Sequence, residues 1–267
     1  MTDLMSMTAR AGASREDVRR ALTDAAEMRI WLADHAESEL PERYAFWGDH
    51  VIEGAAAHQR PLDPEGHDLR FAWTLAGRET IVTVDLAEES ATSTLITLTQ
   101  TEFDLYDPGS LGMLQTFWAL AIANLVDHLE GRPLTYRCDY TSSDLSGGMV
   151  IAATADQVYD SLIDPAKVSR WFGFPVEIEP KVGGKYGIGS IAALTPGRSL
   201  TVSWGPMGTT TFDIDESSGA TTLTLVQGGF DESNPPYAAW AGTMCGMAEV
   251  RRLHELPDWN PIWQGEH

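Results

Sequence analysis

The stretch SREDVRRALTDAAEMRIW at residues 14–31 recurs as TADQVYDSLIDPAKVSRW at residues 154–171. Aligned without a gap at an offset of 140 residues, the two stretches share five identical positions, where about one is expected from ordinary composition. These positions are Val18/Val158, Leu22/Leu162, Asp24/Asp164, Ala26/Ala166 and Trp31/Trp171. A second match, at an offset of 122 residues, places residues 117–119 (FWA) over residues 239–241 (AWA). This repeat predicts two copies of one domain.

The repeat also determines the expected domain boundaries. The 267 residues suit either one large domain or two small ones, and the repeat selects two. We expect domain 1 at residues 1–131, a linker at 132–147 and domain 2 at 148–267. Because the two offsets differ by 18 residues, the first copy contains an insertion, which we place at residues 53–68. This segment is rich in Pro, Gly, Ala and His, so we expect a surface loop, and whether it acts as a lid stays open.

Each copy is expected to contain two short helices, several strands and a long terminal helix. Ser14 and Thr154 are typical N-caps, and Asp164 followed by Pro165 is typical of a helix start. Alternating or β-branched patterns predict strands at residues 69–75, 81–86, 94–100, 176–178, 186–188, 200–204, 209–214 and 221–226. The acidic segment 87–90 is expected to form a turn. Apolar stripes predict the long helices over residues 111–128 and 237–251.

Composition excludes several classes of function. The chain carries 39 Asp and Glu against 18 Lys and Arg, a formal net charge of −21, and no basic run. Binding to nucleic acid or an anionic membrane is therefore not expected, and the acidity is that of a solvated surface. The two cysteines, Cys138 and Cys245, are too far apart in sequence for metal-ligand spacing, and we expect both to be reduced. With no long apolar run and no leader-like N-terminus, a cytoplasmic protein is expected.

The repeated segment resembles a known superfamily. The pattern A-x-x-V-(x)3-L-x-D-(x)6-W is complete in the second copy, where it is followed by the Gly183-Gly184 turn. The first copy keeps Val18, Leu22, Asp24 and Trp31 but lacks that turn. This pattern resembles the SRPBCC superfamily, in the branch named after the activator of the Hsp-ninety ATPase, which is related to START and birch-allergen (Bet v) domains. It is also similar to members found in actinomycete natural-product clusters.

The resemblance implies an α+β fold of two tandem helix-grip (START/Bet v-like) domains. Each would be a curved antiparallel sheet wrapped around a long C-terminal helix, with a cavity between them for an apolar ligand. In natural-product clusters such proteins act as polyketide cyclases or aromatases, carriers or protective binders. The co-chaperone itself has an additional N-terminal domain with no counterpart in this chain, so a chaperone-activating role is less favoured.

Aromatic and methionine residues are the candidate lining of such cavities, and ordinary core packing is the alternative for each of them. The candidates are Trp47, Phe71, Trp73, Trp118, Trp204, Phe212, Tyr237, Trp240, Met244 and Met247. Only weak catalytic candidates exist. His128 and Asn124 lie on the first long helix, where His128 is more typical of a core or helix C-terminal histidine. Arg251 lies near the end of the second, a position that favours the surface.

Other residues carry less chemistry. His50, His58 and His67 are expected to be surface histidines rather than metal ligands, because two of them lie in an irregular segment. No metal site and no cofactor are expected, and no nucleophile–base pattern is recognisable. The leading hypothesis is therefore a protein that binds an apolar small molecule, such as a polyketide or polyene-like intermediate or product. A polyketide cyclase or aromatase and a chaperone-partner or stress-response adaptor stay open as alternatives, as does the oligomeric state.

Overall fold

The computed structural model describes residues 3–263 and divides the chain into two compact units. Unit 1 comprises residues 3–141 together with 262–263, and unit 2 comprises residues 142–261. Residues 262–263 belong to unit 1 because Arg10 N donates a hydrogen bond to Ile262 O at 2.9 Å and Trp263 forms a β-bridge with Ala9. The break after residue 141 falls inside the segment 132–147.

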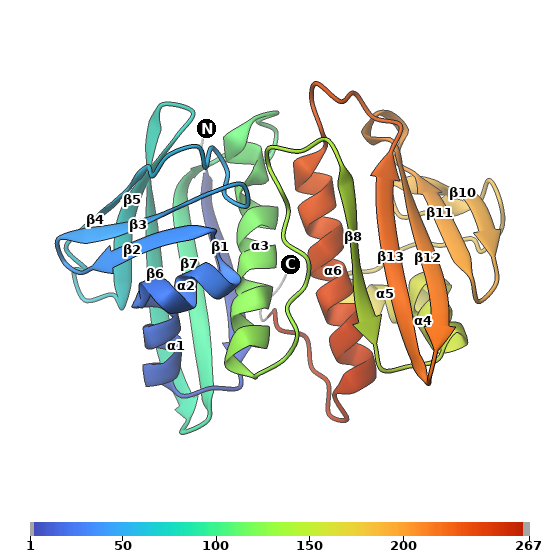
Figure 1. Cartoon of the computed structure of the whole chain (residues 1–267), viewed down its shortest axis with the longest axis horizontal. Coiled ribbons are helices and arrows are strands. Elements are labelled where there is room, and N and C mark those ends of the chain that lie inside the picture. Colours follow the sequence, from blue (N-terminus) through green and yellow to red (C-terminus); the bar gives the residue numbers. More distant parts are fainter. Residues whose placement is uncertain (1–2, 264–267) are drawn as a thin grey trace. The chain divides into compact units, whose positions relative to one another are not determined.

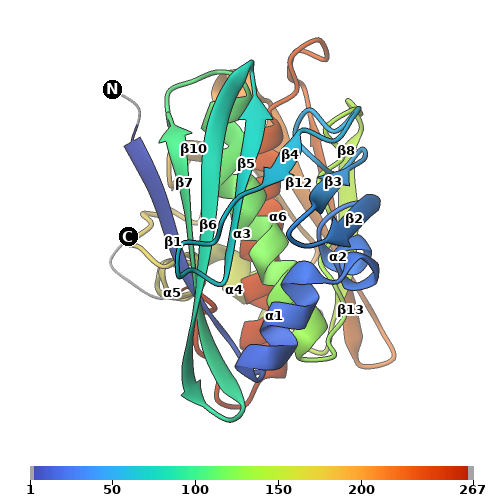
Figure 2. The same cartoon turned by 90° about the vertical axis from the view of Figure 1, so that its left-hand side faces the viewer.

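Unit 1 contains a five-stranded antiparallel sheet in the order β1-β7-β6-β5-β4. Figure 2 shows four of these strands, β1, β7, β6 and β5, side by side. A separate hairpin, β2–β3, lies beside β4, and helix α3 packs against β1 and β7. The elements are β1 (Asp3–Ala11), α1 (Arg15–Thr23), α2 (Ala25–Trp31), β2 (His35–Glu39), β3 (Arg43–Trp47), β4 (Gln59–Pro61), β5 (Leu69–Leu75), β6 (Arg78–Ser90), β7 (Ser93–Phe103) and α3 (Ser110–Leu129).

Unit 2 contains a six-stranded antiparallel sheet in the order β8-β13-β12-β11-β10-β9, with helix α6 beside it (Figure 1). Its elements are β8 (Leu145–Ile151), α4 (Ala155–Ile163), α5 (Pro165–Phe172), β9 (Lys185–Tyr186), β10 (Gly189–Thr195), β11 (Ser199–Ser203), the 3-10 helix η1 (Gly205–Met207), β12 (Thr209–Ser217), β13 (Ala220–Gly228) and α6 (Tyr237–Glu255). Each unit thus pairs an antiparallel sheet with a long helix, as the predicted tandem helix-grip fold requires.

Equivalent hydrogen bonds confirm the repeat atom by atom. Trp31 Nε1 donates to Ala21 O at 3.0 Å, and Trp171 Nε1 donates to Ser161 O at 2.8 Å. The hydroxyls of Tyr44 and Tyr186 donate to the carbonyls of Leu22 and Leu162. The hydroxyls of Thr94 and Thr221 donate to the carbonyls of Ala13 and Ala153. These bonds therefore hold the helix pair in the same way in both units, together with β7 in unit 1 and β13 in unit 2.

The predicted helix caps are confirmed. The Ser14 side chain accepts a hydrogen bond from Asp17 N, and Thr154 forms a complete capping box with Gln157. Asp164 caps α5 with Pro165 in its first turn. Each cap supplies an acceptor to backbone N–H groups that the first turn leaves without a partner, which stabilises a helix by about 1 kcal/mol.

Some predictions of turns, strands and loops are wrong. Segment 87–90 is not a turn, because β6 continues to Ser90 and pairs with β7 across residues 91–92. Its acidic side chains point to solvent, and Glu89 is held by Arg10 at 2.6 and 2.7 Å. Segment 186–188 is not one strand, since Gly187, at φ 54°, separates β9 from β10. Segment 53–68 is not entirely loop, because β4 lies within it.

Six strands were not predicted as strands, namely β1, β2, β3, β4, β8 and β10. Polar residues interrupt the apolar alternation in β2, where only one of five side chains is buried. Among the described residues, no helix has both the length and the apolar character needed to cross a bilayer.

Candidate functional site

The predicted lining residues of unit 1 form a packed aromatic cluster. Phe71, Trp73 and Trp118 are almost completely buried and are joined by Phe46 and Phe117. The ring centroids of Trp73 lie 5.3 Å from those of both Phe46 and Phe117 and 5.9 Å from that of Trp118. Edge-to-face contacts of this kind fill the space between sheet and helix. Trp47 is outside the cluster, because it is half-exposed and stacks on His35.

A polar chain crosses the same interior. Trp118 Nε1 donates to Gln100 Oε1 at 2.6 Å, and Gln100 Nε2 donates to Thr80 Oγ1 at 2.8 Å. Thr80 Oγ1 in turn donates to the backbone carbonyl of Trp73 at 2.9 Å. Both ends of the Gln100 amide therefore have hydrogen-bond partners, whereas Trp73 Nε1 in the same interior is buried without one in the described structure.

The equivalent glutamine of unit 2, Gln227, has a hydrogen-bond partner at only one end of its amide. Residues 94–100 (TLITLTQ) and 221–227 (TTLTLVQ) have the same inward pattern, so Gln227 occupies the place of Gln100. Gln227 Nε2 donates to Met207 O at 2.9 Å. Its Oε1 is buried and has no hydrogen-bond partner among the described residues. An unpaired buried carbonyl costs about 1–3 kcal/mol, so this atom marks a place that favours a donor.

Apolar side chains of α6 and β12 are also buried in unit 2. Trp240, Met244 and Met247 lie on α6 and Phe212 lies on β12, and all four are buried. Trp204 is half-buried, with its ring centroid 5.9 Å from that of Tyr186 and its Nε1 donating to Thr210 Oγ1 at 2.8 Å. Tyr237 is half-buried at the start of α6. Unit 2 therefore contains the predicted wall residues together with an acceptor that sequence reasoning did not single out.

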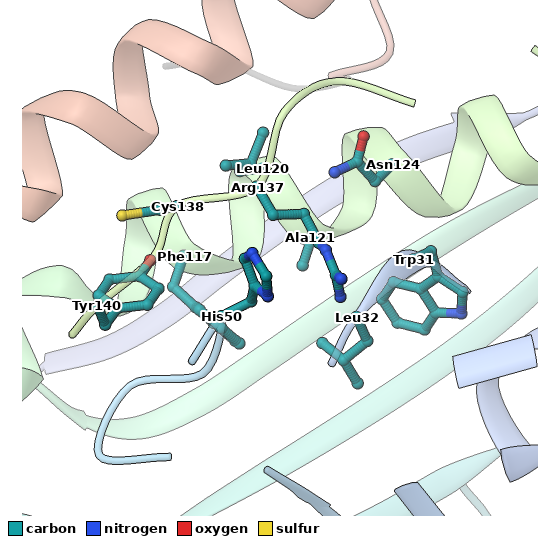
Figure 3. A pocket seen from close by; sticks show the side chains of 10 residues that line it. All are labelled: Trp31, Leu32, His50, Phe117, Leu120, Ala121, Asn124, Arg137, Cys138 and Tyr140. Atoms are coloured by element: carbon teal, nitrogen blue, oxygen red, sulfur yellow. The ribbon is translucent and has the colours of Figure 1, made fainter. Parts of the chain in front are cut away.

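A small cavity lies on another face of α3 in unit 1 (Figure 3). Its volume is about 10 Å³, the space that one water molecule requires. It is lined by Trp31, Leu32, His50, Phe117, Leu120, Ala121, Asn124, Arg137, Cys138 and Tyr140. Four of these residues come from α3 and three from the segment 137–140, which covers the helix. The cavity walls are mainly apolar, with a few polar groups facing inward.

The charged group of this cavity is Arg137. Its Nη2 donates to Asp34 Oδ1 at 3.3 Å, and its Nη1 is buried without a hydrogen-bond partner in the described structure. Burial lowers the pKa of Arg137, and the nearby Asp34 opposes that effect. Burial raises the pKa of Asp34, but hydrogen bonds from the side chain and backbone of His50 outweigh it and leave that pKa below its ordinary value.

His50 is at the surface only in part, and it is paired with a carboxylate. The ring is half-buried and its Nδ1 lies 2.7 Å from Asp34 Oδ1. His67 is exposed and pairs with Asp85, and His58 is exposed. Within residues 3–263 no three His, Cys, Asp or Glu side chains are grouped as a metal site would require. The histidines that are close in sequence thus have separate environments.

The three weak catalytic candidates have different surroundings. Asn124 is buried, but both ends of its amide bond to the backbone of Thr135, so it fastens segment 132–141 to α3. His128 is half-buried, with Nε2 2.6 Å from Glu27 Oε2. Arg251 lies in unit 2, and its predicted surface position is wrong, because the side chain is only 1% exposed. None of them forms a nucleophile–base pair with another.

Comparison with known proteins gives a family match for unit 2. Residues 152–248 match the family described as Activator of Hsp90 ATPase homolog 1-like protein, which confirms the resemblance for that unit. No curated protein sequence matches the chain significantly.

Solved structures are similar at low identity. BexL, the di-domain ARO/CYC of the BE-7585A biosynthetic pathway, is 16% identical, with 97% of this chain and 100% of that chain covered and a TM-score of 0.38. DynU16 of the dynemicin biosynthetic locus is 18% identical, with 95% and 99% covered and a TM-score of 0.39. CalU16 from Micromonospora echinospora is 22% identical, with 49% and 77% covered and a TM-score of 0.39. TM-scores below 0.5 transfer neither activity nor ligand to this chain.

Proposed function

We propose that this protein binds an apolar small molecule carrying a hydroxyl or N–H donor, and that it does so in the helix-grip of unit 2. The observation that carries the proposal is the buried, unpaired Oε1 of Gln227 on the inner face of β13. A buried acceptor of this kind favours binding of a ligand with a hydrogen-bond donor, because the free protein already carries the cost of leaving the carbonyl unpaired.

The contrast between the two units favours unit 2. In unit 1 the equivalent Gln100 has partners at both ends of its amide, and rings interlock around it. In unit 2 the facing helix contributes Met244 and Met247, whose unbranched side chains can change rotamer and admit a guest. We therefore assign this hydroxyl-bearing ligand to unit 2.

The chemistry of the interior indicates a class of ligand. Apolar walls favour a hydrocarbon framework, which gains about 25 cal/mol for each Å² of apolar surface removed from water before association costs. The acceptor favours one hydroxyl on that framework. A phenolic or hydroxylated polyketide or polyene meets both requirements. A role in natural-product biosynthesis or self-protection follows as part of the proposal.

The test locates a probe within the chain. The nine methionines would be labelled with ¹³C at their methyl groups, and 2-naphthol would be titrated into the full-length protein. Substitutions Met244→Ile and Met247→Ile assign the two signals of α6. We expect these two signals to shift most. Shifts confined to unit 1 methionines such as Met28, or no saturable shift at all, would contradict the proposal.

An exposed apolar cluster favours protein docking as a second candidate function, in line with the adaptor alternative. Phe172 and Phe174 are partly exposed with ring centroids 4.4 Å apart, and Ile188 in the adjoining hairpin is 88% exposed. Exposed clusters of this kind often mark interaction surfaces. Phe174→Ser together with Ile188→Ser should abolish capture of a partner while leaving 2-naphthol binding unchanged. Loss of 2-naphthol binding in this variant would argue against separate docking.

A further inference from the structure

The cavity beneath segment 137–140 in unit 1 is separate from the interior assigned to the ligand above. Trp31, Leu32 and Phe117 supply apolar walls, and the Arg137 guanidinium enters from the segment that covers α3. Figure 3 shows this guanidinium between the rings of His50 and Trp31. The cavity therefore combines an apolar enclosure with a strong hydrogen-bond donor.

Most polar groups around the cavity already have partners. The Asn124 amide is bonded at both ends to Thr135, and Tyr140 shares a hydrogen bond with Cys138. Asp34 Oδ1 accepts from both His50 Nδ1 and Arg137 Nη2, and Asp34 Oδ2 accepts from His50 N. Arg137 Nη1 differs from these groups, because it is buried without a partner in residues 3–263.

The charge balance selects the class of acceptor. The positive charge of Arg137 is already matched by Asp34, so a second anion entering the cavity would meet the carboxylate of Asp34 at close range. A neutral carbonyl oxygen accepts from Nη1 without that repulsion. One such oxygen fits the volume of about 10 Å³. The rest of the molecule would lie toward His50 and Arg137, which are both partly exposed.

We propose that this cavity of unit 1 is a second binding site, which takes the carbonyl oxygen of a small neutral ketone, lactone or quinone on Arg137 Nη1. The two units then have opposite preferences. Unit 1 provides a donor for a carbonyl, whereas unit 2 provides an acceptor for a hydroxyl. The site does not depend on the function proposed for unit 2, because the two use different residues of different units.

The experiment uses cyclopentanone as the probe and the full-length protein labelled with ¹⁵N at arginine and tryptophan, so that the Trp31 indole reports binding in every variant. We expect the Arg137 guanidinium signals and the Trp31 indole signal to shift with saturation near about 10 mM, as the ligand efficiency of so small a molecule allows. Arg137→Lys keeps the positive charge beside Asp34 but removes the Nη1 donor, and it should weaken binding at least threefold. The matched control Arg43→Met removes an exposed arginine of the same unit, paired with Glu37, and should leave binding unchanged.

Three outcomes would overturn the proposal. The first is the absence of a saturable shift at Arg137 and Trp31, which would assign the cavity to one ordered water. The second is equal binding by the wild type and Arg137→Lys. The third is tighter binding of acetate than of cyclopentanone, which would show an anion site instead of a carbonyl site. Because the signals belong to unit 1 residues, failure here is distinguishable from failure of the unit 2 proposal, which is followed at Met244 and Met247.

Discussion

The two equivalent glutamines should respond in opposite ways to the same substitution. Gln100→Leu in unit 1 and Gln227→Leu in unit 2 each replace a buried amide by a side chain of similar size. In unit 1 the change removes two hydrogen bonds, to Trp118 Nε1 and to Thr80 Oγ1. It also leaves the buried Trp118 N–H without its acceptor. At about 0.5–1.5 kcal/mol for each bond and about 1–3 kcal/mol for the stranded N–H, we expect a loss of about 2–6 kcal/mol.

Gln227→Leu removes a single bond to the carbonyl of Met207, a half-buried residue. The same change eliminates a buried carbonyl that has no partner in the described structure. These two effects nearly cancel, so the stability of unit 2 should change by less than about 1 kcal/mol in either direction.

Native-state hydrogen exchange read by mass spectrometry measures both effects, because peptides from β7 and β13 report on unit 1 and unit 2 separately. Gln100→Leu should accelerate exchange in β7 peptides, and Gln227→Leu should leave exchange in β13 peptides close to that of the wild type. A loss of 2 kcal/mol or more, on the order of a buried satisfied amide, in Gln227→Leu would refute the reasoning. It would mean that Oε1 of Gln227 has a partner in solution.

Three further substitutions test the local structure. Asn124→Leu removes both side-chain hydrogen bonds to the backbone of Thr135, so it should cost about 1–3 kcal/mol and expose segment 132–141 to limited proteolysis. Gly246→Ala places a Cβ 2.7 Å from the Trp171 ring. The free energy of unfolding should therefore fall by about 1–3 kcal/mol, which a lower melting temperature would show. Burial lowers the pKa of His254 below its ordinary value of 6.5, so its stabilising effect is present above that pH and is lost as the pH falls through the folded-state pKa. His254→Gln should therefore flatten the pH dependence of the free energy of unfolding below about pH 6.5, measured by urea denaturation. An unchanged pH dependence would contradict this.

The repeat was predictable from sequence because the residues that it preserves make the same contacts in both units. Trp31 and Trp171, for example, donate to equivalent carbonyls. A further match, TLITLTQ at residues 94–100 over TTLTLVQ at residues 221–227, is present in the sequence at an offset of 127. It could have identified Gln100 and Gln227 as an inward-facing pair. Only the structure shows that one amide is satisfied and the other is not.

The cavity of unit 1 could not be predicted in the same way. Arg137 lies in a segment that reads as a linker, and its partner Asp34 is 103 residues away in sequence. No periodic pattern connects such residues, since their contact results from the packing of segment 137–140 against α3. For the aromatic residues, the sequence predicts burial but not function. Their number predicts a large apolar interior, but composition does not distinguish a ligand wall from the packed cluster around Trp73.

The central claim is that Gln227 receives a hydroxyl of the ligand, and the most direct test compares two probes on two proteins. The affinities of 2-naphthol and naphthalene would be measured by calorimetry for the wild type and for Gln227→Leu. Because the probes differ by one hydroxyl, the four values give its coupling to Gln227. We predict that the preference for 2-naphthol falls about fivefold in the variant, the effect of one hydrogen bond of about 1 kcal/mol. The same preference in both proteins would contradict the account.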